Sequence, residues 1–95
     1  MLDTELYEKL MEKYLERENL TISLIQKEEG IGFPLAERVY REWNQFHDEL
    51  FWHNAIYEIS FMDEVVTPIR IMRHFHISYY FSTKLLEYYL EQVNG

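Results

Sequence analysis

The chain has 95 residues, of which 47% are hydrophobic and 17% aromatic, so it is long enough for one compact domain with a core rich in rings. Its formal net charge of -8 opposes nonspecific attraction to nucleic acid, since phosphate binding depends on Lys and Arg releasing counterions. The absence of Cys excludes disulfides and thiolate metal sites. No apolar run approaches the roughly 20 residues that span a bilayer, and we expect a cytoplasmic protein that is neither secreted nor membrane-bound.

The acidic residues are unevenly distributed along the chain. Eleven of the 17 lie in residues 1–48. None lies between Val65 and Leu86, where Arg70, Arg73 and Lys84 occur. We therefore expect a locally basic surface on an acidic protein.

The first predicted helix begins after Asp3, which can cap its unpaired amides, with Leu2 and Tyr7 at the two hydrophobic staple positions. The pattern continues to about Arg17. Apolar residues recur at the spacing of one helix face, namely Leu6, Leu10 and Tyr14.

A short second helix and a longer third helix follow. Thr21 is placed to cap the second helix, and Gly30 is placed to end it in the left-handed conformation. Pro34 suits the first turn of the third helix, where its missing N–H costs nothing. One face of the third helix carries Leu35, Val39, Trp43 and Phe46.

Residues 47–62 fit two patterns. Phe51, Ala55, Ile59 and Met62 form a helical stripe, but the segment from Ile56 to Met62 is also rich in strand formers. We favour a helix over a β-ribbon.

The pattern of residues 20–43 then recurs in residues 66–89, at an offset of 46 residues that aligns Thr67 with Thr21. Thr67 is again placed to cap a helix, now followed by Pro68. Residues 76–79 occupy the turn position that residues 30–33 occupy in the first copy. A final helix runs through Leu85, Leu86, Tyr89 and Val93. The matched caps, turns and core positions predict an internal duplication. We expect an all-α fold of two tandem three-helix, helix-turn-helix units, residues 1–47 and 48–95, which share one core in a single compact domain.

Four segments of the first unit carry a resemblance to a known family. They are Leu6–Glu8, Ser23–Lys27, Gly30–Phe33 and Ala36–Val39. This sequence pattern resembles the small winged-helix γ domain of FtsK/SpoIIIE-type DNA translocases over roughly residues 5–43. Residues 49–93 resemble a partial, degenerate second copy of the same domain. The resemblance implies a helix-turn-helix whose second helix reads duplex DNA, with Arg38 on the base-reading face and Lys27 near phosphate.

The second unit places cations among aromatic residues. Rings that stack on bases and Arg or Lys that track phosphate are the components of single-strand binding. The alternative is that the rings are core and the charges only extend outward from them. The candidate nucleic-acid contacts in the two units are Lys27, Arg38, Arg41, Arg70, Arg73, His76, Tyr80 and Lys84.

Three further aromatic residues, Trp43, Phe51 and Trp52, crowd the junction between the two predicted units. They are candidates for partner binding, because aromatic residues concentrate in interface hot spots, or for core packing. The pair His74 and His76, considered with His47 and His53, has no acidic residue at ligand spacing beside it, and the chain has no Cys. We therefore expect no metal.

No nucleotide-binding loop, nucleophile elbow or HExxH sequence occurs, so we expect no catalysis, cofactor or small-molecule substrate. Two functions remain open. One is a helix-turn-helix module that contacts single- or double-stranded DNA chiefly through the second unit. The other is an accessory subunit that docks onto a larger DNA-processing protein, such as a polymerase, primase, helicase or translocase. An acidic DNA mimic is a third idea, although the acids lack regular spacing.

Overall fold

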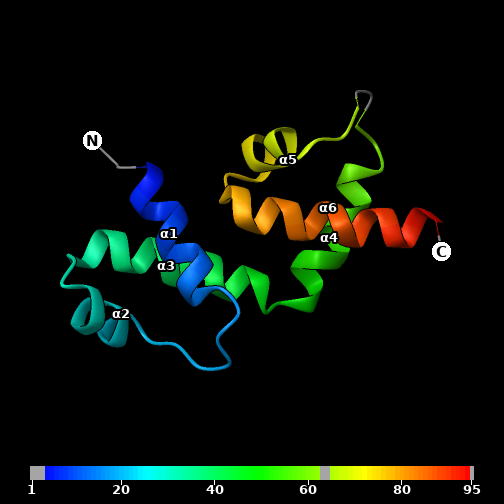
Figure 1. Ribbon diagram of the computed structural model, residues 1–95. Coiled ribbons are helices and arrows are strands. Elements are labelled where there is room, and N and C mark those ends of the chain that lie inside the picture. Colours follow the sequence, from blue (N-terminus) through cyan, green and yellow to red (C-terminus); the bar gives the residue numbers. More distant parts are fainter. Residues whose placement is uncertain (1–3, 63–64, 95) are drawn as a thin grey trace. The chain divides into compact units, whose positions relative to one another are not determined.

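The computed structural model describes residues 4–62 and 65–94, and these residues form helices and no strand, which confirms the all-α prediction. The elements are α1 (Thr4–Tyr14), α2 (Ile22–Glu29), α3 (Phe33–Phe46), α4 (Glu49–Ile59), α5 (Pro68–Phe75) and α6 (Tyr79–Asn94). The chain divides into two compact units, residues 1–47 and 48–95. Each unit contains, in order, a first helix, a short helix and a long helix (Figure 1).

In the first unit, α1 and α2 both pack on α3. The Thr21 hydroxyl accepts a hydrogen bond from the Leu24 N–H at 3.1 Å, and Gly30 ends α2 with a φ of 63°. Pro34 lies in the first turn of α3. These three local predictions are confirmed. The buried apolar side chains of the three helices are Tyr7, Leu10, Met11, Tyr14, Ile25, Ala36 and Val39.

Helix α1 ends at Tyr14, three residues before the predicted end. The Arg17 N–H donates to the Tyr14 carbonyl at 3.1 Å, which closes a tighter turn than the α-helix allows. The chain then leads to the cap of α2. The predicted cap of α1, Asp3, and the staple residue Leu2 lie outside the described residues.

The ambiguous segment 47–62 contains a helix, α4, as favoured. The Asp48 carboxylate caps it by accepting from the Leu50 N–H at 3.0 Å. Ala55 and Ile59, one turn apart, are buried. The Ala55/Ile59 half of the predicted stripe is therefore the side that α4 buries.

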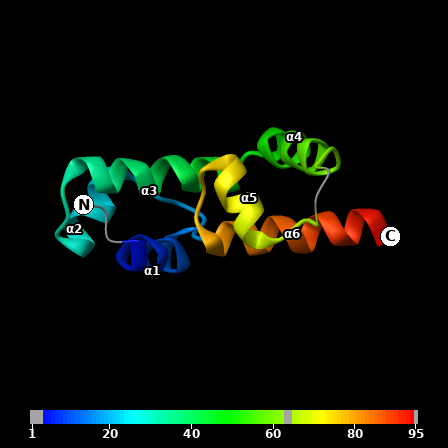
Figure 2. The same ribbon diagram turned by 90° about the horizontal axis from the view of Figure 1, so that it is seen from above.

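The second unit has a core in which aromatic rings pack at tilted and edge-on angles. Helices α4 and α5 both contact α6, and α5 runs beside the first half of α6 (Figure 2). The buried Phe81 ring lies 5.6 Å from that of Phe51 and 5.5 Å from that of Trp52. Phe75 meets Phe51 edge-on at 6.0 Å. Such pairs add about 0.5–1.5 kcal/mol each beyond the burial of their surface.

Residues matched by the sequence repeat adopt the same local backbone. Helices α2 and α5 each have eight residues and a Thr cap. Gly30 and His76 follow them with φ values of 63° and 57°. The next helix begins at Phe33 in one unit and at Tyr79 in the other.

Replacement of His76 with Gly is expected to stabilise the chain by about 0.5–1 kcal/mol. A side chain in the left-handed region costs roughly 1–2 kcal/mol, which Gly avoids, although Gly loses more entropy on folding. The matched change Gly30→Ala is expected to cost about 1 kcal/mol from backbone strain alone, because no atom lies within 4 Å of the added Cβ. Urea denaturation of both variants tests the pair, and a loss of stability in His76→Gly would contradict it.

Candidate functional site

The candidate nucleic-acid contacts of the second unit lie on α5, on the turn after it and on the first half of α6. Arg70, Arg73 and His76 are exposed, and Tyr80 and Lys84 are half-buried. The Lys84 ammonium lies over the Tyr80 ring, 5.2 Å from its centroid. We call these five residues the basic surface.

Helix periodicity orients the cations of α5. Ile71 is fully buried and Phe75, one turn later, is half-buried, so this side of α5 faces the core. Arg70 and Arg73, one turn apart, are exposed. Arg73 is also in the last turn of α5, where a positive charge interacts favourably with the helix dipole.

Acidic residues limit the basic surface on two sides. The Glu58 carboxylate at the end of α4 lies 3.8 Å from His74 Nε2. Glu87 and Glu91 are exposed on α6, one and two turns after Lys84. The stretch that can face phosphate is therefore confined to α5 and the first half of α6.

Two of the three candidate cations of the first unit are engaged within it. The Arg38 guanidinium lies over the Tyr7 ring at 4.4 Å. Arg41 forms an ion pair with Glu37 at 2.8 Å, one turn earlier on α3. Lys27 is exposed on α2. A DNA contact by Arg38 or Arg41 would have to replace these interactions.

Sequence reasoning missed a buried acid in the first unit. Glu42 is only 3% exposed, and its Oε1 accepts a hydrogen bond from the Tyr7 hydroxyl at 2.6 Å. Burial, and then the Glu42 charge, raise the pKa of Tyr7 well above its ordinary value of 10.0. Glu42 lies on the buried side of α3 with Val39, but Glu is usually exposed, so its residue type predicts a solvent-facing side chain.

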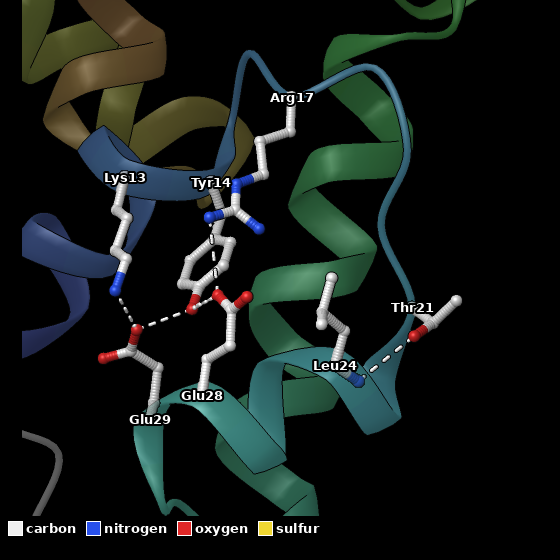
Figure 3. Close-up of polar contacts among 7 residues, drawn as sticks. All are labelled: Lys13, Tyr14, Arg17, Thr21, Leu24, Glu28 and Glu29. Atoms are coloured by element: carbon white, nitrogen blue, oxygen red, sulfur yellow. Dashed lines mark hydrogen bonds and ion pairs between the residues drawn. The ribbon is translucent and has the colours of Figure 1, made fainter.

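A second polar cluster joins α1 to α2 (Figure 3). The Tyr14 hydroxyl lies 2.8 Å from Glu28 Oε1 and 2.5 Å from Glu29 Oε2. Lys13 pairs with Glu29 at 2.6 Å, and Arg17 with Glu28 at 3.4 Å. The Tyr14 hydrogen bond lowers the pKa of Glu28, and the Lys13 and then the Tyr14 hydrogen bonds lower that of Glu29. Two cations and one hydroxyl satisfy both carboxylates. The cluster therefore has a structural role, in which it connects the end of α1 to the end of α2.

The hydrogen bonds of Tyr14 in this cluster predict that the free energy of unfolding falls in alkali. Burial, followed by the hydrogen bonds to Glu29 and Glu28, raises the pKa of Tyr14 above 10.0. Above pH 10 the unfolded chain releases this proton while the folded chain retains it, so stability falls as the pH rises. Urea midpoints between about pH 8 and about pH 11 should decline less steeply in Tyr14→Phe than in the wild type. Equal slopes would contradict the prediction.

The candidate partner residues contribute to packing within their own units. Trp43 Nε1 donates to the Arg17 carbonyl at 2.8 Å. Phe51 and Trp52 pack on Phe81, and Trp52 also meets Tyr88 edge-on at 5.4 Å. All three candidates are half-buried. More exposed apolar side chains that the sequence did not single out lie on and just after α4, namely Leu50, Tyr57 and Phe61.

Within residues 4–62 and 65–94, no three His, Asp or Glu side chains gather closely enough to hold a metal ion. None of the helices described is long and apolar enough to cross a bilayer. Comparison of the chain with protein-family models, curated proteins and solved structures finds no match. The described part of the chain has no strand that could form a wing after α3. The translocase resemblance therefore stays a prediction from the sequence.

Proposed function

We propose that this chain is a non-catalytic, cytoplasmic helix-turn-helix protein that acts in DNA transactions such as replication and binds nucleic acid through the basic surface. The observation that carries the proposal is the Lys84 ammonium over the Tyr80 ring, in a stretch from Val65 to Leu86 that contains no acid. In this reading α5 and α6 are the helix pair, and the turn at His76 joins them.

The chemistry of the basic surface and of the neighbouring residue Tyr79 fits a nucleic-acid strand. Tyr79 is 46% exposed at the start of α6, so a base can stack on its ring. Base stacking on aromatic rings contributes about 1–3 kcal/mol per base. Arg70 and Arg73 are exposed on α5 and can pair with phosphates. The first unit is a weaker candidate because eleven of the 17 acids lie in residues 1–48, and carboxylates repel phosphate.

Fluorescence anisotropy with labelled single-stranded and duplex DNA tests the proposal, at about 50 mM and about 200 mM salt. Arg73→Glu combined with Lys84→Glu is expected to weaken binding by about tenfold or more. The matched control is Lys9→Glu on the exposed side of α1, which makes the same type of charge change outside the basic surface. The proposal would be overturned by absence of binding, by an affinity that does not change with salt, or by an equal loss of affinity in the control.

A second candidate function is docking onto a larger DNA-processing protein as an accessory subunit, with DNA contact made in the complex. The observation that favours it is the exposure of Leu50, Tyr57 and Phe61 in the second unit, since exposed apolar patches mark interaction sites. The test is reconstitution of a complex from the purified chain and a partner identified in the native host. Recovery of DNA without any stable protein partner would overturn docking.

A further inference from the structure

Helix α4 is apolar on two opposite sides. Its buried side carries Ala55 and Ile59. Leu50, Tyr57 and Phe61 are 63%, 65% and 67% exposed, and their spacing of seven and four residues places them on one side of a helix. Phe61 continues the helical path, because its N–H donates to the Glu58 carbonyl at 3.1 Å. We call these three residues the α4 outer stripe.

Packing within the second unit does not account for the outer stripe. The Tyr57 and Phe61 rings meet edge-on at 4.9 Å, but each remains about two-thirds exposed. A contiguous apolar side of a helix is usually covered by another element or molecule. The outer stripe therefore has the properties of an interface that is filled by another molecule.

The charges around the outer stripe are of one sign. From Glu42 to Ile69 the sequence contains no Lys or Arg. The acids of this stretch are Glu42, Asp48, Glu49, Glu58, Asp63 and Glu64. Asp48 at the cap of α4 and Glu49 and Glu58 within it are exposed. A molecule that covers the stripe meets carboxylates beside its apolar anchors.

We infer that the α4 outer stripe docks a basic amphipathic helix of a partner protein. The inference rests on the docking function and names the chemistry of the partner. The stripe spans the 12 residues from Leu50 to Phe61, or about 16 Å of helix between the first and last, which matches a partner helix with anchors one turn apart over three turns. Lys or Arg beside those anchors would pair with Glu49 and Glu58.

Two other occupants fit the charges less well. A second copy of this chain that met the stripe with its own α4 would oppose acids to acids, with no Lys or Arg on α4 to compensate. Nucleic acid would bring phosphates against the same carboxylates. Of the three occupants, a basic amphipathic helix is the one complementary both to the apolar stripe and to the acidic residues beside it.

NMR titration of the full, isotope-labelled chain tests the inference. The probe is a synthetic peptide of about 14 residues, made of Leu and Lys in an amphipathic helical order. Backbone signals of α4 should shift. Tyr57→Ser combined with Phe61→Ser should weaken binding by about tenfold or more. The matched control, Leu90→Ser combined with Val93→Ser, changes two apolar residues that are also exposed and should bind within about twofold of the wild type.

Further arms separate the alternatives. A scrambled Leu/Lys peptide that binds equally well would show attraction by charge alone and overturn the inference. A Leu/Glu amphipathic peptide that binds the stripe equally well would overturn the basic partner but leave docking intact. Signals that shift only outside α4 would refute this surface, while docking itself is judged by reconstitution. Sedimentation of a wild-type dimer that Tyr57→Ser and Phe61→Ser dissociate would assign the stripe to a second copy.

Discussion

Replacement of Phe81 with Ala is expected to destabilise the second unit by about 3–5 kcal/mol. The Phe81 side chain is fully buried, and its ring meets those of Phe51 and Trp52 at 5.6 Å and 5.5 Å. Removal of the ring loses its burial, leaves a cavity and breaks both aromatic contacts. The loss is a large part of the 5–15 kcal/mol that stabilises an ordinary domain.

The two tryptophans allow each unit to be followed separately. Trp43 lies on α3 in the first unit and Trp52 on α4 in the second. In a Trp43→Phe background the remaining fluorescence reports the second unit, and in a Trp52→Phe background it reports the first. The Trp52 transition in urea should move to lower concentration in Phe81→Ala. The single shared core expected from the sequence predicts that the Trp43 transition moves with it.

Tyr79→Ala provides the control for the loss of a ring near the start of the same helix. Tyr79 is 46% exposed, so its removal should change stability by much less than the removal of Phe81. Similar losses in the two variants would contradict the assignment of Phe81 to the core. A Trp43 transition that stays in place while that of Trp52 shifts would contradict the shared core.

The features that the sequence predicted correctly depend on neighbours along the chain. Thr21 and Thr67 cap helices through their own hydroxyl groups, and Gly30 adopts the left-handed conformation that a helix end requires. Helical periodicity was also enough to favour α4 over a ribbon. Each of these features spans one turn or one helix, so residue type and spacing identify it.

The features that the sequence missed depend on contacts between distant segments. Glu42 is buried because it meets Tyr7, 35 residues earlier in the chain. The Tyr14 hydroxyl, at the end of α1, bonds carboxylates at the end of α2 that lie 14 and 15 residues later in the chain. The outer stripe of α4 could not be distinguished from its core side by periodicity, because apolar residues occur on both sides. Contacts made only in the folded state decided all three.

Replacement of Tyr7 with Phe is expected to cost about 1.5–3 kcal/mol, the range for a hydrogen bond to a charged group. The change removes only the hydroxyl that donates to Glu42 at 2.6 Å and retains the ring beneath the Arg38 guanidinium. Tyr40→Phe is the matched control, because the Tyr40 ring stacks on Trp43 at 5.7 Å and its hydroxyl has no hydrogen-bond partner among the described residues. We expect the control to lie within about 0.5 kcal/mol of the wild type.

A double-mutant cycle assigns the Tyr7→Phe loss to the bond itself. With Glu42→Gln as the second change, urea denaturation should give a coupling energy of about 0.5–3 kcal/mol. Coupling near zero, or equal losses in Tyr7→Phe and Tyr40→Phe, would show that the bond contributes nothing to stability. The Tyr7→Phe variant also separates an effect on folding from an effect on DNA binding, because Tyr7 lies in the first unit and the basic surface in the second. Folded Tyr7→Phe should therefore bind DNA with wild-type affinity, and a loss comparable to that of Arg73→Glu with Lys84→Glu would move the nucleic-acid site to the first unit.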